Sequence, residues 1–201
     1  MRIAFKEWAI VVDALGRGEQ ILILRKGGLR EGRGGFALEH PQFLLFPTLF
    51  HQQRESVAAP AQARFDKIIR RFPTPDTVRI EFFCDVAAWQ RVDSLAAAGR
   101  LRGQHIWREE VIAGRFDRGK DKRIQALAVR VFRLAQAVQV PMLDRYGGCK
   151  SWIELVQEIA TDGAAPVLTD AEFNRKLDAF RSALEMGVTA ATDERTVGTS
   201  E

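Results

Sequence analysis

The apolar run at residues 124–134, IQALAVRVFRL, constrains the fold more than any other segment of the sequence. Apart from Gln125 near its start, it is apolar on both faces of an extended chain except at Arg130 and Arg133. Strands that are buried on both faces read as near-continuous apolar runs, whereas half-exposed strands alternate between apolar and polar residues. We therefore expect this run to be a long central strand of a sheet.

Shorter apolar runs bounded by glycine or proline predict the other strands of that sheet. We expect strands at residues 19–26, at 42–48 (starting after Pro41 and stopped by Pro47), at TVRIEFFCDV (77–86) and at HIWREEVIA (105–113), although the last segment can also be helical. The glycine-rich residues 27–41 are expected to be a long hairpin-like connection. Together these runs predict about five strands in a mixed or antiparallel, curved and possibly barrel-like sheet.

Apolar residues at helical spacing predict the helices. Residues 3–15 have Phe5, Trp8, Val12 and Leu15 at such spacing, and AQARFDKIIRRF (61–72) is an amphipathic basic segment. SLAAAG (94–99) predicts a short helix or a turn. Two segments open with a capping box, in which a Ser or Thr is followed three residues later by Glu. These boxes are Ser151 with Glu154, and Thr169 with Glu172 ahead of the stripe Phe173, Leu177, Phe180 and Leu184.

The order of these segments predicts an α+β fold in one domain over residues 1–160, with an appended helix at 161–187. After Gly187 the chain is small, polar and aperiodic, so residues 188–201 are expected to be a disordered tail. The sequence has no apolar run of the length that a membrane-spanning helix needs. Lys6, Glu7 and Asp13 interrupt the apolar N-terminus, so a signal peptide is not expected. We expect a cytoplasmic location without membrane contact.

Charge is unevenly distributed along the chain. Residues 1–150 contain 26 Lys and Arg against 16 Asp and Glu, and residues 151–201 contain four against ten. A basic body favours an anionic partner, of which nucleic acid is the first example, and an acidic C-terminal segment can screen such a surface. The three histidines and two cysteines have no metal-ligand spacing, and no cofactor motif occurs.

Several segments together resemble a prokaryotic family catalogued as domain of unknown function 1802. They are FKEWAIVVDAL, QILILRKGGLRE, FLLFPTLFHQ, HIW with RF downstream, LAVRVFRL and YGGCKSWIEL, between residues 3 and 156, so the chain after 160 lies outside the resemblance. The resemblance implies no established activity. By analogy alone, a small closed barrel similar to the PUA/ASCH class of RNA-binding domains is one form that the sheet can take.

The loop LRKGGLREGRGGF at residues 24–36 is the first candidate anion site. It has no Walker A string, and Gly32, Gly34 and Ala37 fit a dinucleotide fingerprint only in spacing, because a strand and not a helix is expected to follow. Consecutive glycines can still direct backbone N–H groups at an anion, with Arg25, Lys26 and Arg30 beside them. The alternative is a plain turn with solvated arginines.

Residues 100–123 are the second candidate, with eight Lys and Arg interleaved with His105, Trp107 and Phe116. Aromatic rings among basic residues suit base stacking and phosphate contacts, although the same pattern fits a solvated surface with the rings in the core. The residues predicted to bind phosphate or nucleic acid are Arg25, Lys26, Trp107, Arg115, Lys120 and Lys150. Lys26 and Gly28 are expected to lie near His51 or the YGGCK turn.

Two other kinds of function remain open at this point. An enzyme acting on a phosphorylated or nucleotide substrate could use His51 with Glu31 or Glu39 as acid and base, since histidine titrates near neutrality. No nuclease E-x-K strand and no G-x-S-x-G elbow accompanies them. The third possibility is an interaction domain without a small ligand, whose basic face binds an acidic protein.

Overall fold

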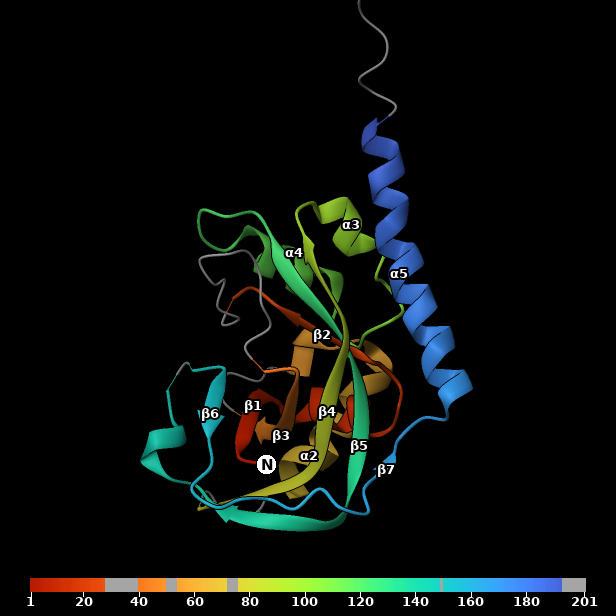
Figure 1. Cartoon of the computed structure of the whole chain (residues 1–201). Coiled ribbons are helices and arrows are strands. Elements are labelled where there is room, and N and C mark those ends of the chain that lie inside the picture. Colours follow the sequence, from red (N-terminus) through yellow and green to blue (C-terminus); the bar gives the residue numbers. More distant parts are fainter. Residues whose placement is uncertain (28–39, 50–53, 72–75, 149, 193–201) are drawn as a thin grey trace, which may run out of the picture.

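The computed structural model describes residues 1–27, 40–49, 54–71, 76–148 and 150–192, and it shows one curled sheet with helices packed around it (Figure 1). The strands are β1 (Ile3–Trp8), β2 (Leu22–Arg25), β3 (Gln42–Thr48), β4 (Thr77–Val92), β5 (Ile124–Pro141), β6 (Trp152–Glu154) and β7 (Ala165–Pro166). The helices are α1 (Ala9–Gly16), α2 (Ala59–Arg71), α3 (Leu95–Gly99), α4 (Glu109–Asp117) and α5 (Asp170–Thr192), with the short 3₁₀ turns η1 (Arg54–Ser56) and η2 (Asp144–Tyr146).

The sheet is mixed, and its strand order is β2-β5-β4-β3-β1-β6, with β7 also paired to β5. Only β1 and β3 run parallel to each other, and the other pairs are antiparallel. The long strands β4 and β5 bend along their length, and their register shifts at two irregularities. The predicted α+β class, curved mixed sheet and C-terminal helix are confirmed, and the seven strands exceed the expected number.

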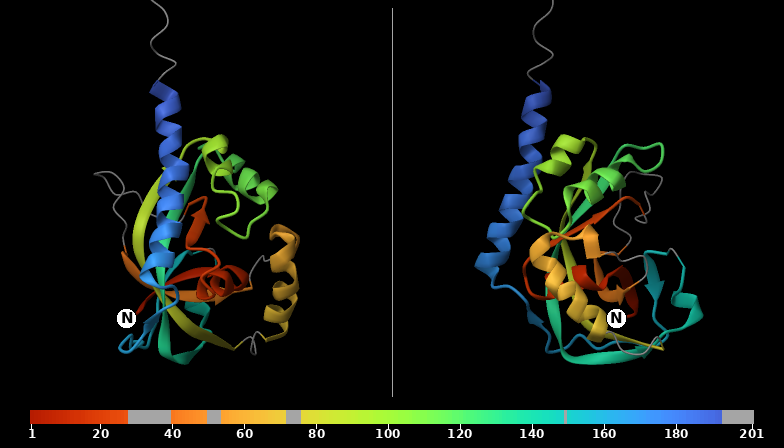
Figure 2. Two further views of the ribbon diagram at one scale, coloured as in Figure 1. Left: turned by 90° about the vertical axis from the view of Figure 1, so that its right-hand side faces the viewer. Right: turned by 180° about the vertical axis from the view of Figure 1, so that it is seen from behind.

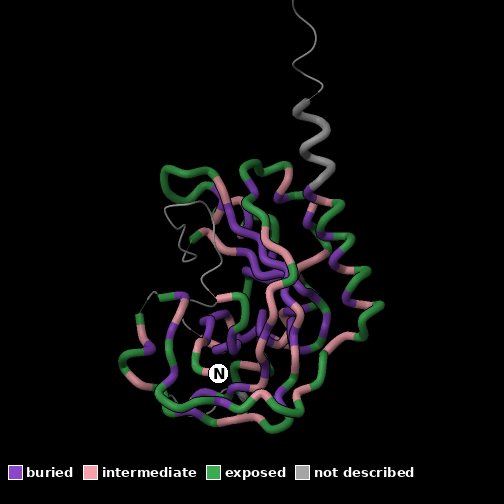
Figure 3. The backbone as a smooth tube through the Cα atoms, in the orientation of Figure 1, coloured by how far each residue is buried: buried purple, intermediate pink, exposed green. Residues whose placement is uncertain are grey.

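Strand β5 occupies the central place that its sequence predicts. Residues 125–128 lie between β2 and β4, and Phe132 and Arg133 lie between β7 and β4. Residues from Ile124 to Val129 are all buried, as a strand covered on both faces must be. This stretch belongs to the larger of two apolar clusters, and the smaller one includes Phe46, Leu134 and Tyr146. Figure 3 shows the buried parts of the backbone in the interior of the molecule.

Helix α5 forms with the predicted cap and stripe. The backbone N–H of Glu172 donates to Thr169 Oγ1 at 3.3 Å, and that of Thr169 donates to Glu172 Oε2 at 3.0 Å. The four stripe residues are buried in the larger apolar cluster. The helix continues to Thr192, beyond the predicted end at 187, and residues 193–201 of the predicted tail lie outside the described residues.

The predicted helix at residues 3–15 is wrong in its first half, which is strand β1. Ala4, Phe5, Lys6 and Glu7 are all buried because β1 lies between β3 and β6. The Lys6 ammonium remains buried by donating to the backbone carbonyls of Tyr146 at 2.8 Å and Gly148 at 2.7 Å. Tertiary partners therefore allow polar residues inside a strand whose apolar spacing resembles that of a helix.

Two further segments differ from the prediction because their backbones pair with distant chain. Residues 106–108 bond to residues 56–58, and helix α4 follows, where a strand was the first expectation. The capping box predicted at Ser151 and Glu154 does not form, because the backbone of Ser151 and Leu155 bonds to that of Lys6 and Arg2 and so extends the chain as β6.

The expected hairpin between residues 19–26 and 42–48 is also wrong. Strands β5 and β4 separate β2 from β3 in the sheet. Strand β3 itself is confirmed, but it runs through Pro47, which is paired with Glu7 of β1, rather than stopping there.

Candidate anion-binding site

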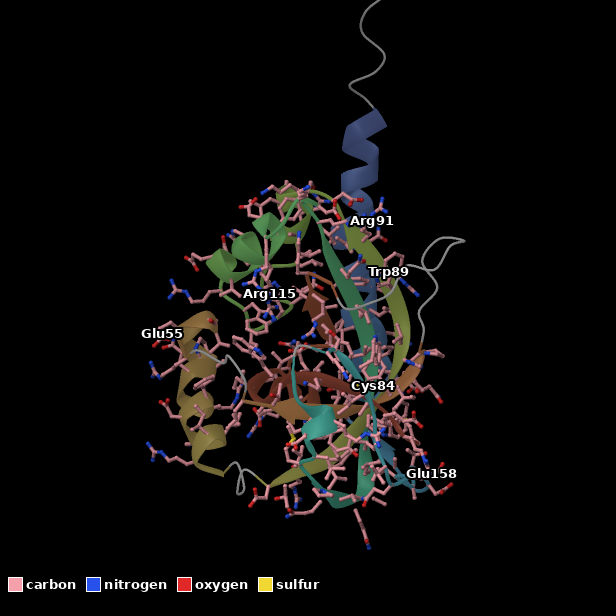
Figure 4. All side chains as sticks on the ribbon, turned by 90° about the vertical axis from the view of Figure 1, so that its left-hand side faces the viewer. Glu55, Cys84, Trp89, Arg91, Arg115 and Glu158 are labelled. Atoms are coloured by element: carbon pink, nitrogen blue, oxygen red, sulfur yellow. The ribbon has the colours of Figure 1, made fainter. Side chains whose placement is uncertain are left out.

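Six residues predicted from the sequence to bind phosphate converge at one end of the sheet, which we call the basic end: Arg25, Lys26, Trp107, Arg115, Lys120 and Lys150. Arg115 projects from α4 and donates through Nη1 to the backbone carbonyl of Leu24 in β2 at 3.0 Å (Figure 4). The next residue along the strand, Arg25, donates to Ser151 Oγ at 2.8 Å. Lys150 directly precedes Ser151 in the chain. Sequence positions more than a hundred residues apart therefore meet here.

Arg115 stacks on the ring of Trp107, with Trp8 nearby. Its guanidinium carbon lies 3.8 Å from the centre of the Trp107 ring and 5.9 Å from that of Trp8. The two rings themselves meet edge to face, with centroids 4.8 Å apart. Stacking and the Leu24 contact fix the orientation of the guanidinium, which leaves most of its N–H donors for another acceptor.

The electrostatic environment of Arg115 is unfavourable for its charge. Burial, which is the largest effect, and the neighbouring Arg25 and Arg118 together lower the pKa of Arg115 from 12.5 to about 10, and Glu7 opposes them. Within the described residues no carboxylate forms an ion pair with Arg115. A desolvated cation without a paired anion is the arrangement that an anionic ligand would complete.

Glu7 is the buried carboxylate of this region, with 2% of its side chain exposed. Its Oε2 lies 3.5 Å from Arg25 Nη1, and its Oε1 accepts the backbone N–H of Trp8 at 2.8 Å. Arg25 also stacks at 4.9 Å over the ring of Phe5. One carboxylate thus faces two guanidiniums, and the balance of charge stays positive.

The other predicted residues have different surroundings. The Lys26 ammonium donates to the backbone carbonyls of Phe116, Asp121 and Arg123, so it fixes the loop after α4. Lys120 in that loop is exposed, and so is Lys150. Nearby carboxylates pair within the same loop, Asp117 with Lys122 and Asp121 with Arg123.

Trp107 cannot stack on a base as it lies in the structure. Its side chain is only 4% exposed, and Arg115 covers its ring face. Phe116 is also in the core. The structure supports the alternative in which Trp107 and Phe116 are core residues. At the basic end, Trp107 is the ring on which Arg115 stacks.

The proposed catalytic residues Glu31, Glu39 and His51 lie outside the described residues, and so does Gly28. Lys26 contacts the loop at 116–123, whereas it is Arg25 that links to the end of the YGGCK segment through Ser151. In the described part of the chain no three His, Cys, Asp or Glu residues are grouped as metal ligands would be.

Sequence reasoning missed Glu7, Trp8 and Ser151. Glu7 and Trp8 were assigned to a helix, and Ser151 to a helix cap. The available clue was the charged pair Lys6 and Glu7 within an apolar run. Charged residues that are buried need partners, so such a pair indicates polar groups nearby in the fold.

The fold and site thus define an α+β protein with a curled mixed sheet and a candidate anion site at one sheet end. A family model described as "Domain of unknown function (DUF1802)" matches residues 4–179, and the chain belongs to this family. The match continues past residue 160 into α5, so the expectation that the family-like region ends before that helix is wrong.

Among solved structures, the chain is similar to ASCH from Zymomonas mobilis, with 12% sequence identity, a TM-score of 0.43 and coverage of 88% of this chain and 93% of that one. A tyrosine-to-phenylalanine mutant of the same protein is similar with 13% identity, a TM-score of 0.40 and coverage of 88% and 96%. The comparison with curated proteins finds no match. None of the helices that the structure describes is long and apolar enough to cross a membrane.

Proposed function

We propose that this protein binds nucleic acid through its phosphates at the basic end, with Arg115 as the central contact. The observation that carries the proposal is that Arg115 is desolvated and oriented by Trp107 but has no ion pair with any described carboxylate. A phosphate oxygen is an acceptor that matches the planar guanidinium donors, and the resulting charge-assisted bonds are among the strongest in proteins.

The surroundings of Arg115 favour a phosphate chain over a single phosphate. Besides the half-buried Arg25 and Arg115, Lys120 and Lys150 are exposed, and Arg118 is exposed in the same loop as Lys120. Because the tryptophan rings are engaged by Arg115, the basic end offers little for reading bases. We therefore expect binding that depends on the phosphate backbone and varies little with sequence.

The test is an anisotropy titration of a fluorescein-labelled single-stranded oligonucleotide at two salt concentrations. Arg115→Gln should weaken binding about tenfold, because one charge-assisted contact is lost, and should reduce the salt dependence. Replacing Lys120 and Lys150 by Gln should weaken binding less, since exposed charges are screened. Arg181→Gln is the matched control, because Arg181 is half exposed on α5 and its ion pair within the described part of the chain is with Asp178.

Circular dichroism melts of each variant confirm that the fold persists. Lack of binding by the parent protein at low salt would contradict the proposal. Equal affinity of the Arg115→Gln and Arg181→Gln variants would also contradict it, and would move the contact surface to α2, where Lys67 and Arg70 are available. Competition by inorganic phosphate alone at equal phosphate concentration would favour a small phosphorylated ligand instead.

A further inference from the structure

A cleft lies beside the junction of β1 and α1. Trp8 belongs to the basic end, whereas Ala9, the next residue, lines this cleft of about 620 Å³ between α1, α2 and the strands β3, β4 and β5. Its apolar lining includes Val12, Pro47, Ile68 and Phe82. This volume is in the range of small-molecule sites in proteins, which combine apolar walls with a few placed polar groups.

Arg133 of β5 is the most firmly oriented polar group of the cleft. Its Nη2 donates to the carbonyl of Gly16 at 3.0 Å, and its Nη1 lies 3.7 Å from Glu81 Oε2. Its guanidinium carbon lies 4.7 Å from the centre of the Phe82 ring. The side chain is nevertheless 54% exposed, so these contacts present the guanidinium to the cleft rather than bury it.

An irregularity in the sheet brings Glu81 and Phe82 to the same cleft. Ile80 pairs with Val138, but Phe82 pairs with Arg133, so β5 contains extra residues opposite Glu81. Consecutive residues of a regular strand point to opposite faces, whereas here both line the cleft. Such bulges redirect side chains and are common beside binding sites.

The floor of the cleft depends on a close approach of α1 to β4. A Cβ atom added to Gly16 would lie 2.3 Å from the nearest ring carbon of Phe82, so only glycine allows the ring to rest against the end of α1. The same glycine supplies the carbonyl that holds Arg133. One residue therefore positions both the aromatic floor and the cation.

Positive charge exceeds negative charge around the cleft. Glu81 is shared between Arg79, at 3.0 Å, and Arg133. Asp13 is engaged by Arg17 and by Arg64, each at 3.1 Å. The lining thus offers three guanidiniums, from Arg17, Arg79 and Arg133, against two carboxylates that are already paired.

We infer that this cleft binds a small organic anion with an aromatic or other apolar body. Its anionic group would face Arg133 and Arg79, and its body would lie between Phe82 and Ile68. The inference is independent of the proposed nucleic-acid binding, because none of the residues of the basic end lines the cleft.

The test uses 1-anilinonaphthalene-8-sulfonate, an aromatic anion, as the probe, and N-phenyl-1-naphthylamine as its neutral counterpart. In a fluorescence titration, Arg133→Gln should weaken binding of the sulfonate about tenfold and leave the neutral compound unaffected, since only the charged contact is lost. Ile68→Trp, which fills the cleft, should weaken both compounds. Two-dimensional ¹H–¹⁵N spectra should show the largest shifts at Gly16, Phe82 and Arg133.

Arg145→Gln is the control, because Arg145 is exposed and lies outside the cleft lining. Should Arg133→Gln fail to fold, Arg79→Gln replaces it, since Arg79 is half exposed and its ion pair among the described residues is with Glu81. The inference is overturned if the sulfonate shifts map elsewhere. It is equally overturned if the charge substitutions change the affinities for the two compounds by the same factor. Oligonucleotide binding by Arg133→Gln should equal that of the parent protein, which separates this test from that of the basic end.

Discussion

Arg115 and Arg130 both lie over aromatic rings, but only Arg130 has an ion-pair partner among the described residues. Arg130 lies over the rings of Phe173 and Phe132 at 5.2 and 5.7 Å, and Arg115 lies over Trp107 and Trp8. Asp170 at the start of α5 pairs with Arg130. No described carboxylate pairs with Arg115.

The difference shows what distinguishes a structural cation from a candidate binding cation. Arg130 completes the contact between β5 and α5, and its charge is neutralised within the fold. The charge of Arg115 is desolvated without such a partner, so an ion pair with a ligand anion would offset the cost of that desolvation. A count of basic residues does not separate the two cases.

Figure 2 shows that α5 and α2 lie on separate sides of the molecule, and α5 is fastened by its buried stripe. Deleting residues 161–201 to unmask the basic end would therefore remove part of the core. Phe180 alone is 2% exposed, and truncating such a ring costs about 3–5 kcal/mol. Substitutions that change charge without removing apolar area are the sound way to test the comparison of the two arginines.

The largest effect is expected for Glu7→Gln. Removing the buried carboxylate leaves Arg25 and Arg115 without their nearby negative charge, which should cost about 3 kcal/mol of unfolding free energy. The same change should strengthen oligonucleotide binding, because a competing internal anion is gone. Urea denaturation and anisotropy measure the two effects. Lower affinity in folded Glu7→Gln would show that Glu7 positions the site rather than competing for it.

A smaller effect is expected from the pH dependence of stability. Burial, and secondly Arg115, lower the pKa of His105 from 6.5 to about 4. The unfolded chain therefore takes up a proton that the folded chain refuses as pH falls from about 6.5 to 5, and stability should decrease by about 1.5 kcal/mol over that range. Above about pH 7.5 the imidazole is neutral in both states, so this contribution is constant.

His105→Asn retains an acceptor near the position of Nδ1, which accepts the Trp107 N–H at 3.2 Å, but does not titrate. Its stability should be flatter over the same pH range in denaturant unfolding. Arg115→Gln should also flatten the curve in part, because its charge helps to lower the pKa of His105. A His105→Asn curve parallel to that of the parent protein would argue against this linkage.

The smallest effect is expected for Asp170→Asn. The carboxylate is 82% exposed, and exposed ion pairs contribute about 0.5 kcal/mol. Oligonucleotide affinity should not change, since Arg130 belongs to the α5 contact and not to the basic end. A gain in affinity comparable to the loss in Arg115→Gln would mean that freeing any aromatic-stacked arginine creates a binding site, and would remove the distinction between the two arginines.

The sequence by itself determined the elements whose local pattern and tertiary role agree. The run at residues 124–134 is β5, which is central because both of its faces are apolar. The Thr169–Glu172 box and its stripe became α5, because a cap and a helical period act within a few residues of chain. The basic residues that converge at one sheet end were also identifiable from their charge and their place beside predicted strands.

Only the tertiary structure decided which polar residues became buried and with which partners. Ser151 and Glu154 satisfy the rule for a helix cap, but the backbone from Ser151 onward bonds to β1 instead. Lys6 and Glu7 can lie inside a strand because residues distant in sequence pair with them. Lys6 donates to the carbonyls of Tyr146 and Gly148, and Glu7 forms an ion pair with Arg25. A sequence pattern records the preferences of neighbouring residues, whereas the free energy of a buried charge depends on groups that the chain brings together only on folding.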